Sequence, residues 1–314
     1  MALFYVHFFH RFYYGAKPFI PRNIRMFLRR QRAQAVLKSS GDIWPINRTT
    51  CKKPNGWPGW PQKKQFAFVL THDVESQKGI DRLQKLAELE MELGFRSSFN
   101  LIPEGEYKVS KELRDWLTEN GFEVGVHDLH HNGKLYNSRR SFLKKANRIN
   151  HYLKEWGAVG FRAGFMLREL DWHHDLDILY DLSTFDTDPF EPQPEGTGTI
   201  FPFRINRTES GRENKYIELS YTLAQDSTLF LILKEQTPAT WIEKLDWLAQ
   251  EGGMALVNVH PDYIATPKSN LGAYEYPLNH YRELLHYVKE QYRDQYWHAL
   301  PHEVASYAAK VLPD

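Results

Sequence analysis

The sequence predicts an α/β fold, an irregular (β/α) barrel preceded by an N-terminal basic extension. From Gln65 onward, short apolar runs alternate with segments of helical periodicity, which is typical of a parallel sheet with right-handed crossovers. Acidic, histidine and arginine side chains directly follow several of these runs, as expected where parallel strands end at one rim of a barrel. The 314 residues suffice for one large domain and an appendage. An open doubly wound sheet is the second choice.

The first 64 residues are predicted to form a basic, aromatic extension that ends in a Pro/Gly/Trp-rich linker, and residues 65–314 to form the barrel. Residues 1–64 contain 13 Lys+Arg and one acid, a net charge of +12, which leaves 40 − 13 = 27 basic and 39 − 1 = 38 acidic residues in the remainder. The remainder therefore has a net charge of −11. Prolines and glycines crowd around Trp57 and Trp60 and place the boundary near Gln62.

Within the extension, the stretch PRNIRMFLRRQRAQAVL predicts an amphipathic helix. Its apolar side chains Ile24, Phe27 and Leu28 share one face at i, i+3 and i+4. They are flanked by Arg22, Arg25, Arg29, Arg30 and Arg32. Such a helix suits either peripheral contact with an anionic membrane through residues 1–35 or packing on the acidic barrel or on a second subunit.

Composition excludes several classes of protein. The overall net charge of +1 argues against a nucleic-acid binder, and the lone Cys51 excludes a disulfide framework and a cysteine-built metal site. No run approaches 18 apolar residues, so no transmembrane helix is expected. The start MALFYVHFFHRFYYG lacks the features of a secretory signal. We therefore expect a cytoplasmic protein, with peripheral contact at the inner face of the membrane as an option; the oligomeric state is open.

The elements of the barrel follow from the pattern. Strands are expected at Phe66–Leu70, Phe95–Ile102, Phe122–Val126, Gly160–Met166, Ala255–Val259 and Tyr296–Leu300. Helices are expected at Asp81–Leu93, Lys111–Asn120, Ser138–Trp156, Thr240–Gln250, Pro277–Gln291 and Glu303–Leu312. Residues 195–237 break the alternation, with three extra strands and no helix. These extra strands are expected at Ile200–Asn206, Tyr216–Tyr221 and Leu229–Leu233.

Two segments after strands carry metal-binding chemistry. His127 and His131 are four residues apart, and on one helical turn both imidazoles can bind one cation; the alternative is a pair of surface histidines. Asp73 and Glu75 place two carboxylates within three residues. Two acids this close repel unless a cation or proton intervenes, so one can bind metal while the other acts as a general base. The alternative is an N-cap for the next helix.

Two further residues suit acid–base chemistry. Arg162 in GFRAG follows a strand and can keep a carboxylate ionised through bidentate hydrogen bonds, or form an ordinary salt bridge at the rim. His260 follows ALVNV and can act as a general acid if a carboxylate orients its ring, or can be a core histidine.

The ordered set FAFVLTHDVE, GVHDLHH, GFRAG and VNVH resembles the successive motifs of the polysaccharide deacetylase family, also called the NodB-homology deacetylases or carbohydrate esterase family four. The resemblance covers roughly Gln65 to Pro261, and STFDTDPFEPQ with GTGTIFPF also resembles a bacterial branch of the family. It implies an irregular barrel of the glycoside hydrolase/deacetylase type and a divalent metal, most often Zn²⁺.

The resemblance also implies roles for individual residues. The metal ligands would be Glu75, His127 and His131 and the general base Asp73, with the roles of Asp73 and Glu75 exchanged as an alternative. Arg162 would orient the base, and His260 would protonate the leaving amine. The acid that orients His260 is expected in STFDTD, with Asp186 favoured.

The resemblance implies metal-dependent hydrolysis of the N-acetyl group of an amino sugar in a glycan or glycan precursor, with a carbohydrate as substrate and no nucleic-acid partner. Two alternatives stay open: a metal-dependent amidohydrolase on a non-carbohydrate amide, and a non-catalytic glycan-binding barrel. The chain departs from the family motifs at Val74, which replaces a second Asp, at Asp128, which replaces Ser or Thr, and at Gly164 and Phe165, where a proline is usual.

Overall fold

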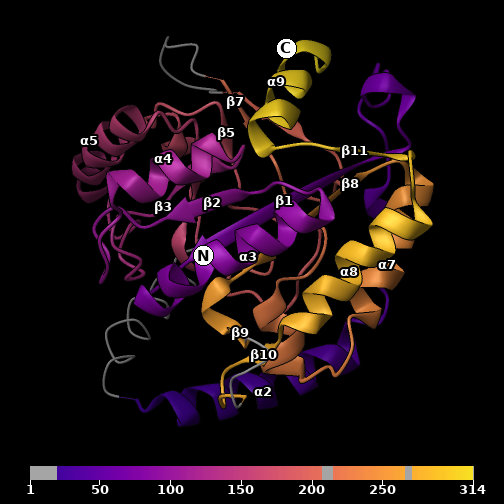
Figure 1. The fold of residues 1–314 in the computed structure, drawn as a ribbon, viewed down its shortest axis with the longest axis horizontal. Helices are drawn as coiled ribbons and strands as arrows, with labels where there is room; N and C mark the ends of the chain where they lie inside the picture. The colour runs from indigo at the N-terminus through magenta and orange to yellow at the C-terminus, as the bar shows by residue number, and fades with distance from the viewer. Residues whose placement is uncertain (1–19, 207–214, 266–270, 314) are drawn as a thin grey trace.

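The computed structural model describes residues 20–206, 215–265 and 271–313 (Figure 1). Residues 1–19, which hold the aromatic start of the predicted extension, lie outside the described residues. In the described part of the chain, no helix is both long enough and apolar enough to cross a membrane.

A curled, mostly parallel sheet forms the centre of the molecule. Its strands lie in the order β11-β1-β2-β3-β4-β5-β7-β6, β8 pairs with the other edge of β1, and only β6 and β7 run antiparallel. The strands are β1 (Phe66–Val74), β2 (Ser98–Leu101), β3 (Glu123–His127), β4 (Gly160–Arg162), β5 (Tyr180–Asp181), β6 (Phe203–Ile205), β7 (Tyr216–Glu218), β8 (Met254–Val259) and β11 (Tyr296–His298). A separate small pair joins β9 (Ile264–Ala265) to β10 (Tyr276–Pro277).

Isolated bridges carry the sheet round into a barrel. Phe185 bridges in parallel to Tyr221, and Leu223 bridges in parallel to Val257 of β8. The segment that follows β7 therefore pairs with β8, and β8 pairs with β1, so the sheet closes on itself. The predicted irregular barrel is confirmed, and the carboxyl ends of its strands meet at one rim.

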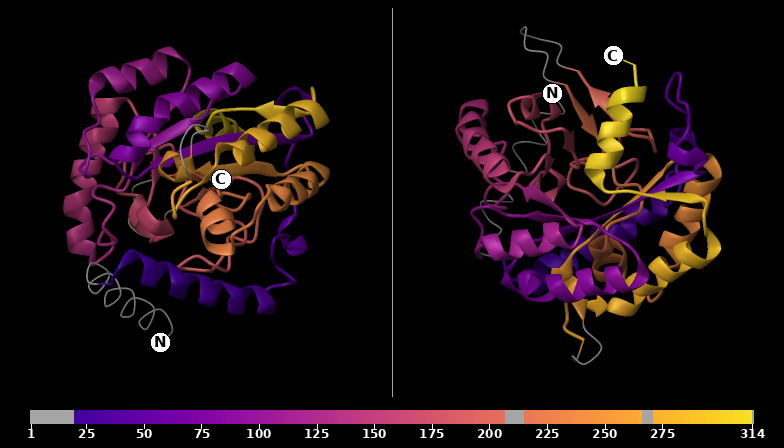
Figure 2. Two further views of the ribbon diagram at one scale, coloured as in Figure 1. Left: turned by 60° about the horizontal axis from the view of Figure 1, so that its bottom comes forward. Right: turned by 45° about the horizontal axis from the view of Figure 1, so that its top comes forward.

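Helices surround this sheet (Figure 2). They are α2 (Arg22–Ser39), α3 (Gln77–Leu93), α4 (Lys111–Glu119), α5 (Arg139–Trp156), α6 (Leu170–His173), α7 (Ala239–Glu251), α8 (Leu278–Gln291) and α9 (Pro301–Val311). Leu83, Leu86 and Leu89 of α3 are buried, as their helical spacing predicts. The same helix ends at Gly94, whose left-handed φ of 84° suits glycine and allows its N–H to cap two carbonyls of the last turn.

One predicted strand is wrong. Leu229–Leu233 belongs to a π-helical segment, Ser227–Leu233, whose N-cap Asp226 accepts a hydrogen bond from the backbone N–H of Ser227. A short run of consecutive apolar residues is compatible with a strand or with a helix buried on several sides, and periodicity cannot separate them. In the structure Thr228, Leu229, Phe230, Leu231 and Ile232 are all buried, as in a helix covered on several sides.

The end of the predicted extension packs on the barrel. Trp44 and Trp60 are buried within the main hydrophobic core, and the indole Nε1 of Trp60 donates to the carbonyl of Gly252 at 2.8 Å. The domain boundary near Gln62 stays a prediction, but the linker before it is an ordered part of the barrel's surface layer.

A buried acidic pair lies under this layer. Tyr221 donates to both Asp188 Oδ2 at 2.8 Å and Glu191 Oε1 at 3.1 Å, and both acids are buried. Burial and the neighbouring charge of Glu191 raise the pKa of Asp188 to about 8. The folded protein therefore holds a proton on this pair that the unfolded chain releases near pH 4.

We expect the contribution of the Asp188–Glu191 pair to the free energy of unfolding to fall as the pH rises from about 4 to about 8. In that window the folded state binds more protons than the unfolded state, so the free energy of unfolding falls with pH. The measurement is urea unfolding at the two ends of the window for wild type and Asp188→Asn. An unchanged difference between the two pH values in the variant would contradict the shared proton.

Candidate metal and acid–base site

Three side chains converge at the rim of the barrel. One ligand atom each from Glu75, His127 and His131 lies within 4.8 Å of the others, with His131 Nε2 at 3.3 Å from Glu75 Oε1. Glu75 comes directly after β1, and His127 is the last residue of β3. Two imidazoles and one carboxylate are the ligand types that zinc and related divalent cations prefer.

The environment of His127 fits a metal ligand. Its Nδ1 lies 3.1 Å from the backbone carbonyl of Arg162, which can only accept, so Nδ1 carries the proton. The lone pair is then on Nε2, which is buried and has no hydrogen-bond partner among the described residues. An imidazole held by a carbonyl at one nitrogen and open at the other is the usual arrangement of a metal-binding histidine.

A tight non-helical turn brings His127 and His131 together, instead of the helical turn that their spacing predicts. After β3 the chain enters a non-helical loop in which Asp128 has φ 55° and His131 has φ 48°. The two rings nevertheless lie 4.8 Å apart, centre to centre. The expectation of a helical turn is therefore wrong, although the convergence of the two rings is correct.

The next loop supports His131. Phe165 stacks on the imidazole at 4.2 Å with a left-handed φ of 60°, and Met166 follows with φ 52°. A Cβ on Gly164 would lie 2.8 Å from Cδ2 of His131, so only glycine permits this approach. Four left-handed residues other than glycine, in the two loops 128–131 and 165–166, thus hold strained backbone at the candidate site.

Asp73 lies buried beside the cluster, with polar side chains bonded to both of its oxygens. Its Oδ1 accepts from Asn100 and its Oδ2 from Asn258, both at 2.8 Å, and Arg162 Nη1 lies 3.3 Å from each oxygen. Burial alone would raise the pKa of Asp73, but the charges of Arg162 and His260 and the hydrogen bond from Asn100 lower it well below the ordinary carboxyl range. Asp73 is therefore ionised at neutral pH and able to accept a proton.

His260 follows β8 on the other side of the cluster. Its Nε2 lies 3.8 Å from Glu75 Oε1 and 4.0 Å from Asp73 Oδ2, while its Nδ1 lies 2.6 Å from Asp226 Oδ1. Burial would lower the pKa of His260, but the charge and hydrogen bond of Asp226 outweigh it and raise the pKa to about 10. The ring is therefore an imidazolium at neutral pH with Nε2–H directed at the cluster.

The acid beside His260 is Asp226 and not the predicted Asp186. Asp186 accepts a hydrogen bond at 2.7 Å from Lys244, an ion pair buried away from His260. The bridges explain the difference. The segment that carries Leu223 pairs directly with β8, so Asp226 emerges next to His260, whereas Phe185 pairs one position farther round the barrel.

Glu75 is also fixed by its neighbours. Tyr263 donates to Oε2 at 2.5 Å, and the side chain of Asp262 accepts from the backbone N–H of Glu75 at 2.9 Å. Burial would raise the pKa of Glu75, but the charges of His131 and His260 and the bond from Tyr263 lower it to about 2. Glu75 Oε1 is thus an ionised oxygen that faces the rings of His131 and His260.

Comparison with known proteins is informative at the level of structure. No protein-family model matches the chain, and no curated protein sequence matches it. A protein of Mycobacterium smegmatis described as a candidate polysaccharide deacetylase superimposes with a TM-score of 0.59 and 18% identity, over 83% of this chain and 96% of that one. The chain has the fold of that protein.

Two other structures with related descriptions are less similar. The peptidoglycan deacetylase PdaC of Bacillus subtilis has a TM-score of 0.45 and 12% identity, over 78% of this chain and 93% of its own. A Bordetella bronchiseptica protein described as involved in O-antigen biosynthesis has a TM-score of 0.45 and 17% identity, over 79% of this chain and 86% of its own. The likeness of fold to a known structure therefore rests on the first superposition.

Four polar residues of the site were not anticipated from the sequence: Asn100, Asn258, Asp226 and Tyr263. Both asparagines lie inside buried strands, where an amide without a hydrogen-bond partner would be costly. An asparagine within a predicted buried strand therefore indicates a polar partner nearby. Asp226 follows no regular strand of the alternating pattern, and Tyr263 follows β8 only after the turn at His260, so neither had a comparable signal.

We expect Arg162→Met to destabilise the metal-free protein by about 3 kcal/mol or more, because it leaves the Asp73 carboxylate buried without its counter-charge. The measurement is urea unfolding in the presence of a chelator. The double variant Arg162→Met/Asp73→Asn removes the orphaned charge and should recover part of the loss. A double variant no more stable than Arg162→Met would argue against a dominant ion pair.

Proposed function

We propose that this protein is a metal-dependent deacetylase that hydrolyses the N-acetyl group of an amino sugar in a glycan or glycan precursor. The observation that carries the proposal is the arrangement around the three-ligand cluster. An ionised carboxylate, Asp73, and an imidazolium, His260, lie within 4.0 Å of each other, and Glu75 lies 3.8 Å from that imidazolium. Amide hydrolysis needs both a base for water and an acid for the departing nitrogen.

In this proposal, Glu75, His127 and His131 hold a divalent cation, with Zn²⁺ favoured by the ligand set. The bound cation would acidify water and polarise a carbonyl oxygen. Glu75 is assigned as the ligand because its free oxygen faces the histidines, whereas both oxygens of Asp73 are engaged by side-chain donors.

The chain's own residues then move the protons. Asp73 accepts a proton from the attacking water, and the Arg162 guanidinium keeps the carboxylate ionised and fixed. His260 donates its Nε2 proton to the nitrogen of the scissile amide, while Asp226 holds the ring by Nδ1. The nitrogen leaves as a neutral amine, which is the step that an amide cannot complete without an acid.

The substrate class rests on the motif resemblance together with the shared fold. The same acid–base pair would serve any small acyl amide, so a non-carbohydrate amide is the competing substrate. Acetate release from N-acetylated sugar oligomers and from simple acetamides, measured side by side, separates the two.

We expect the wild-type protein to bind about one equivalent of Zn²⁺, and His127→Ala to lose both the metal and acetate release, because one of three ligands is gone. The measurements are elemental analysis after dialysis and an acetate assay on N-acetylglucosamine oligomers. The matched control is His151→Ala, an exposed histidine on α5. Equal acetate release by wild type and His127→Ala would refute the proposal, as would the absence of metal uptake by wild type.

We expect Asp226→Asn to lower kcat by about 10²- to 10⁴-fold, because the amide neither charges nor orients His260. Asp186→Asn should retain about the wild-type rate per folded molecule, since Asp186 pairs with Lys244 instead. Both rates are referred to the folded fraction, measured by circular dichroism. A larger loss in Asp186→Asn than in Asp226→Asn would reverse the assignment of the orienting acid.

A further inference from the structure

Exposed large apolar side chains gather on helix α2 and just after it. Among the described residues, five of the eight exposed large hydrophobic side chains lie between residues 24 and 43: Ile24, Phe27, Leu28, Leu37 and Ile43. The other three, Leu143, Val159 and Leu271, are scattered over other parts of the molecule. Four of the five, all but Ile43, lie on α2. Single exposed apolar residues are ordinary, but such a concentration on one helix marks an interaction surface.

The exposed residues occupy the outer face of α2. Ile24, Phe27 and Leu28 are 47%, 59% and 56% exposed and share one face at i, i+3 and i+4. Met26 and Ala33, on the opposite face, are buried against the barrel. We call the surface formed by Ile24, Phe27 and Leu28 the outer apolar face. Since α2 already packs by its inner face, the barrel does not cover the outer one.

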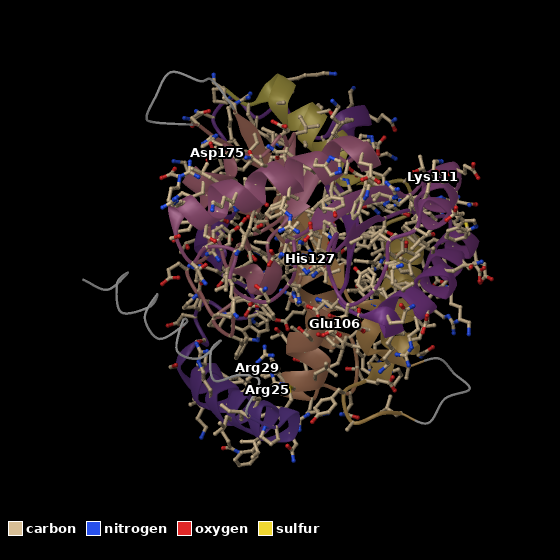
Figure 3. All side chains as sticks on the ribbon, turned by 90° about the vertical axis from the view of Figure 1, so that its left-hand side faces the viewer. Arg25, Arg29, Glu106, Lys111, His127 and Asp175 are labelled. Atoms are coloured by element: carbon tan, nitrogen blue, oxygen red, sulfur yellow. The ribbon has the colours of Figure 1, made fainter. Side chains whose placement is uncertain are left out.

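The described arginines of α2 lie at its flanks and towards the barrel, where Arg25 is half-buried and Arg29 lies near the buried Glu191. Arg30 donates to the carbonyl of Leu231 and ties the helix to the π-helical segment, whereas Arg29 and Arg32 remain exposed beside a small cavity that Phe190 and Ile232 also line. The helix Arg22–Ser39 contains no acidic residue. Figure 3 shows α2 at the edge of the molecule, with Arg25 and Arg29 on the side of the helix that is turned towards the rest of the protein.

We propose that the outer apolar face of α2 docks on the surface of an anionic lipid bilayer. Two observations select this occupant. The face presents bulky apolar side chains on a helix that contains five arginines and no acidic residue, a composition that suits a helix lying in a membrane interface. The charge of the chain is also divided, with +12 in residues 1–64 and −11 in the remainder, so only the N-terminal part is attracted to anionic lipid.

The position of α2 gives the docking a consequence for the site. The helix packs against the π-helical segment Ser227–Leu233, and the N-cap of that segment is Asp226, the partner of His260. A bilayer against α2 would thus lie close to the rim that carries the candidate site. The docking itself does not depend on the proposed function, and binding can be measured without turnover.

The test is flotation of the full-length protein with two kinds of vesicle, phosphatidylglycerol mixed with phosphatidylcholine and phosphatidylcholine alone. The variant Ile24→Ser/Phe27→Ser/Leu28→Ser removes the outer apolar face. The matched control Leu143→Ser/Val159→Ser/Leu271→Ser removes three other exposed apolar side chains, which are 41%, 38% and 58% exposed. A second variant, Arg29→Gln/Arg32→Gln, removes charge and leaves the apolar residues in place.

We expect wild type and the matched control to float with the anionic vesicles, and the outer-face variant to bind at least about tenfold more weakly. The charge variant should also bind more weakly, and its binding should depend less on salt. Thermal unfolding and light scattering accompany each sample.

Three results would overturn the proposal. The first is equal flotation of wild type and the outer-face variant, which would place any membrane contact elsewhere in the chain. The second is a fall in oligomeric mass in that variant, because the face would then be covered by a second copy. The third is a loss of thermal stability without any change in flotation, because the face would then be covered by the chain itself.

Discussion

The buried ion pair between Asp73 and Arg162 is the interaction on which the arrangement of the site depends. Both side chains are almost completely removed from water, so each would be strongly destabilising without the other. Asn100 and Asn258 satisfy the remaining lone pairs of the carboxylate, and Thr71 accepts from the guanidinium. These partners come from four strands, and their bonds hold the strand ends in one fixed relation.

The position of β1 explains why one strand end can organise the site. β1 is the longest strand, with β2 and β11 on one edge and β8 on the other. Its last residues therefore lie between the ends of β2 and β8, which supply Asn100 and Asn258. His127 follows two strands farther round, and its Nδ1 is fixed by the carbonyl of the same Arg162 that neutralises Asp73. Arg162 therefore has two roles: its guanidinium neutralises Asp73, and its backbone carbonyl orients the ring of His127.

The polar network continues outward from this pair in two directions. One branch passes through Glu75 to Tyr263 and Asp262, and the other through His260 to Asp226 and on to Tyr276, which also donates to Asp226. In each branch one atom of a side chain faces the metal-ligand cluster and another atom is held by a hydrogen bond. Tyr263 holds Oε2 of Glu75, and Asp226 holds Nδ1 of His260. This is the arrangement that keeps a reactive group oriented before a substrate arrives.

The alternation of strands and helices, the helix ends at glycines, and the segments that carry Asp73, Glu75, His127, Arg162 and His260 can all be predicted from the sequence. These features are local, because they depend on periodicity and on residue types next to strand ends. The folded chain was needed to show that Asp226 and not Asp186 meets His260, and that the two histidines converge through a left-handed turn. It also showed that Leu229–Leu233 is helical. The physical reason is that such choices depend on which segments lie side by side in the barrel, and the bridges from Leu223 to Val257 and from Phe185 to Tyr221 join residues far apart in the chain.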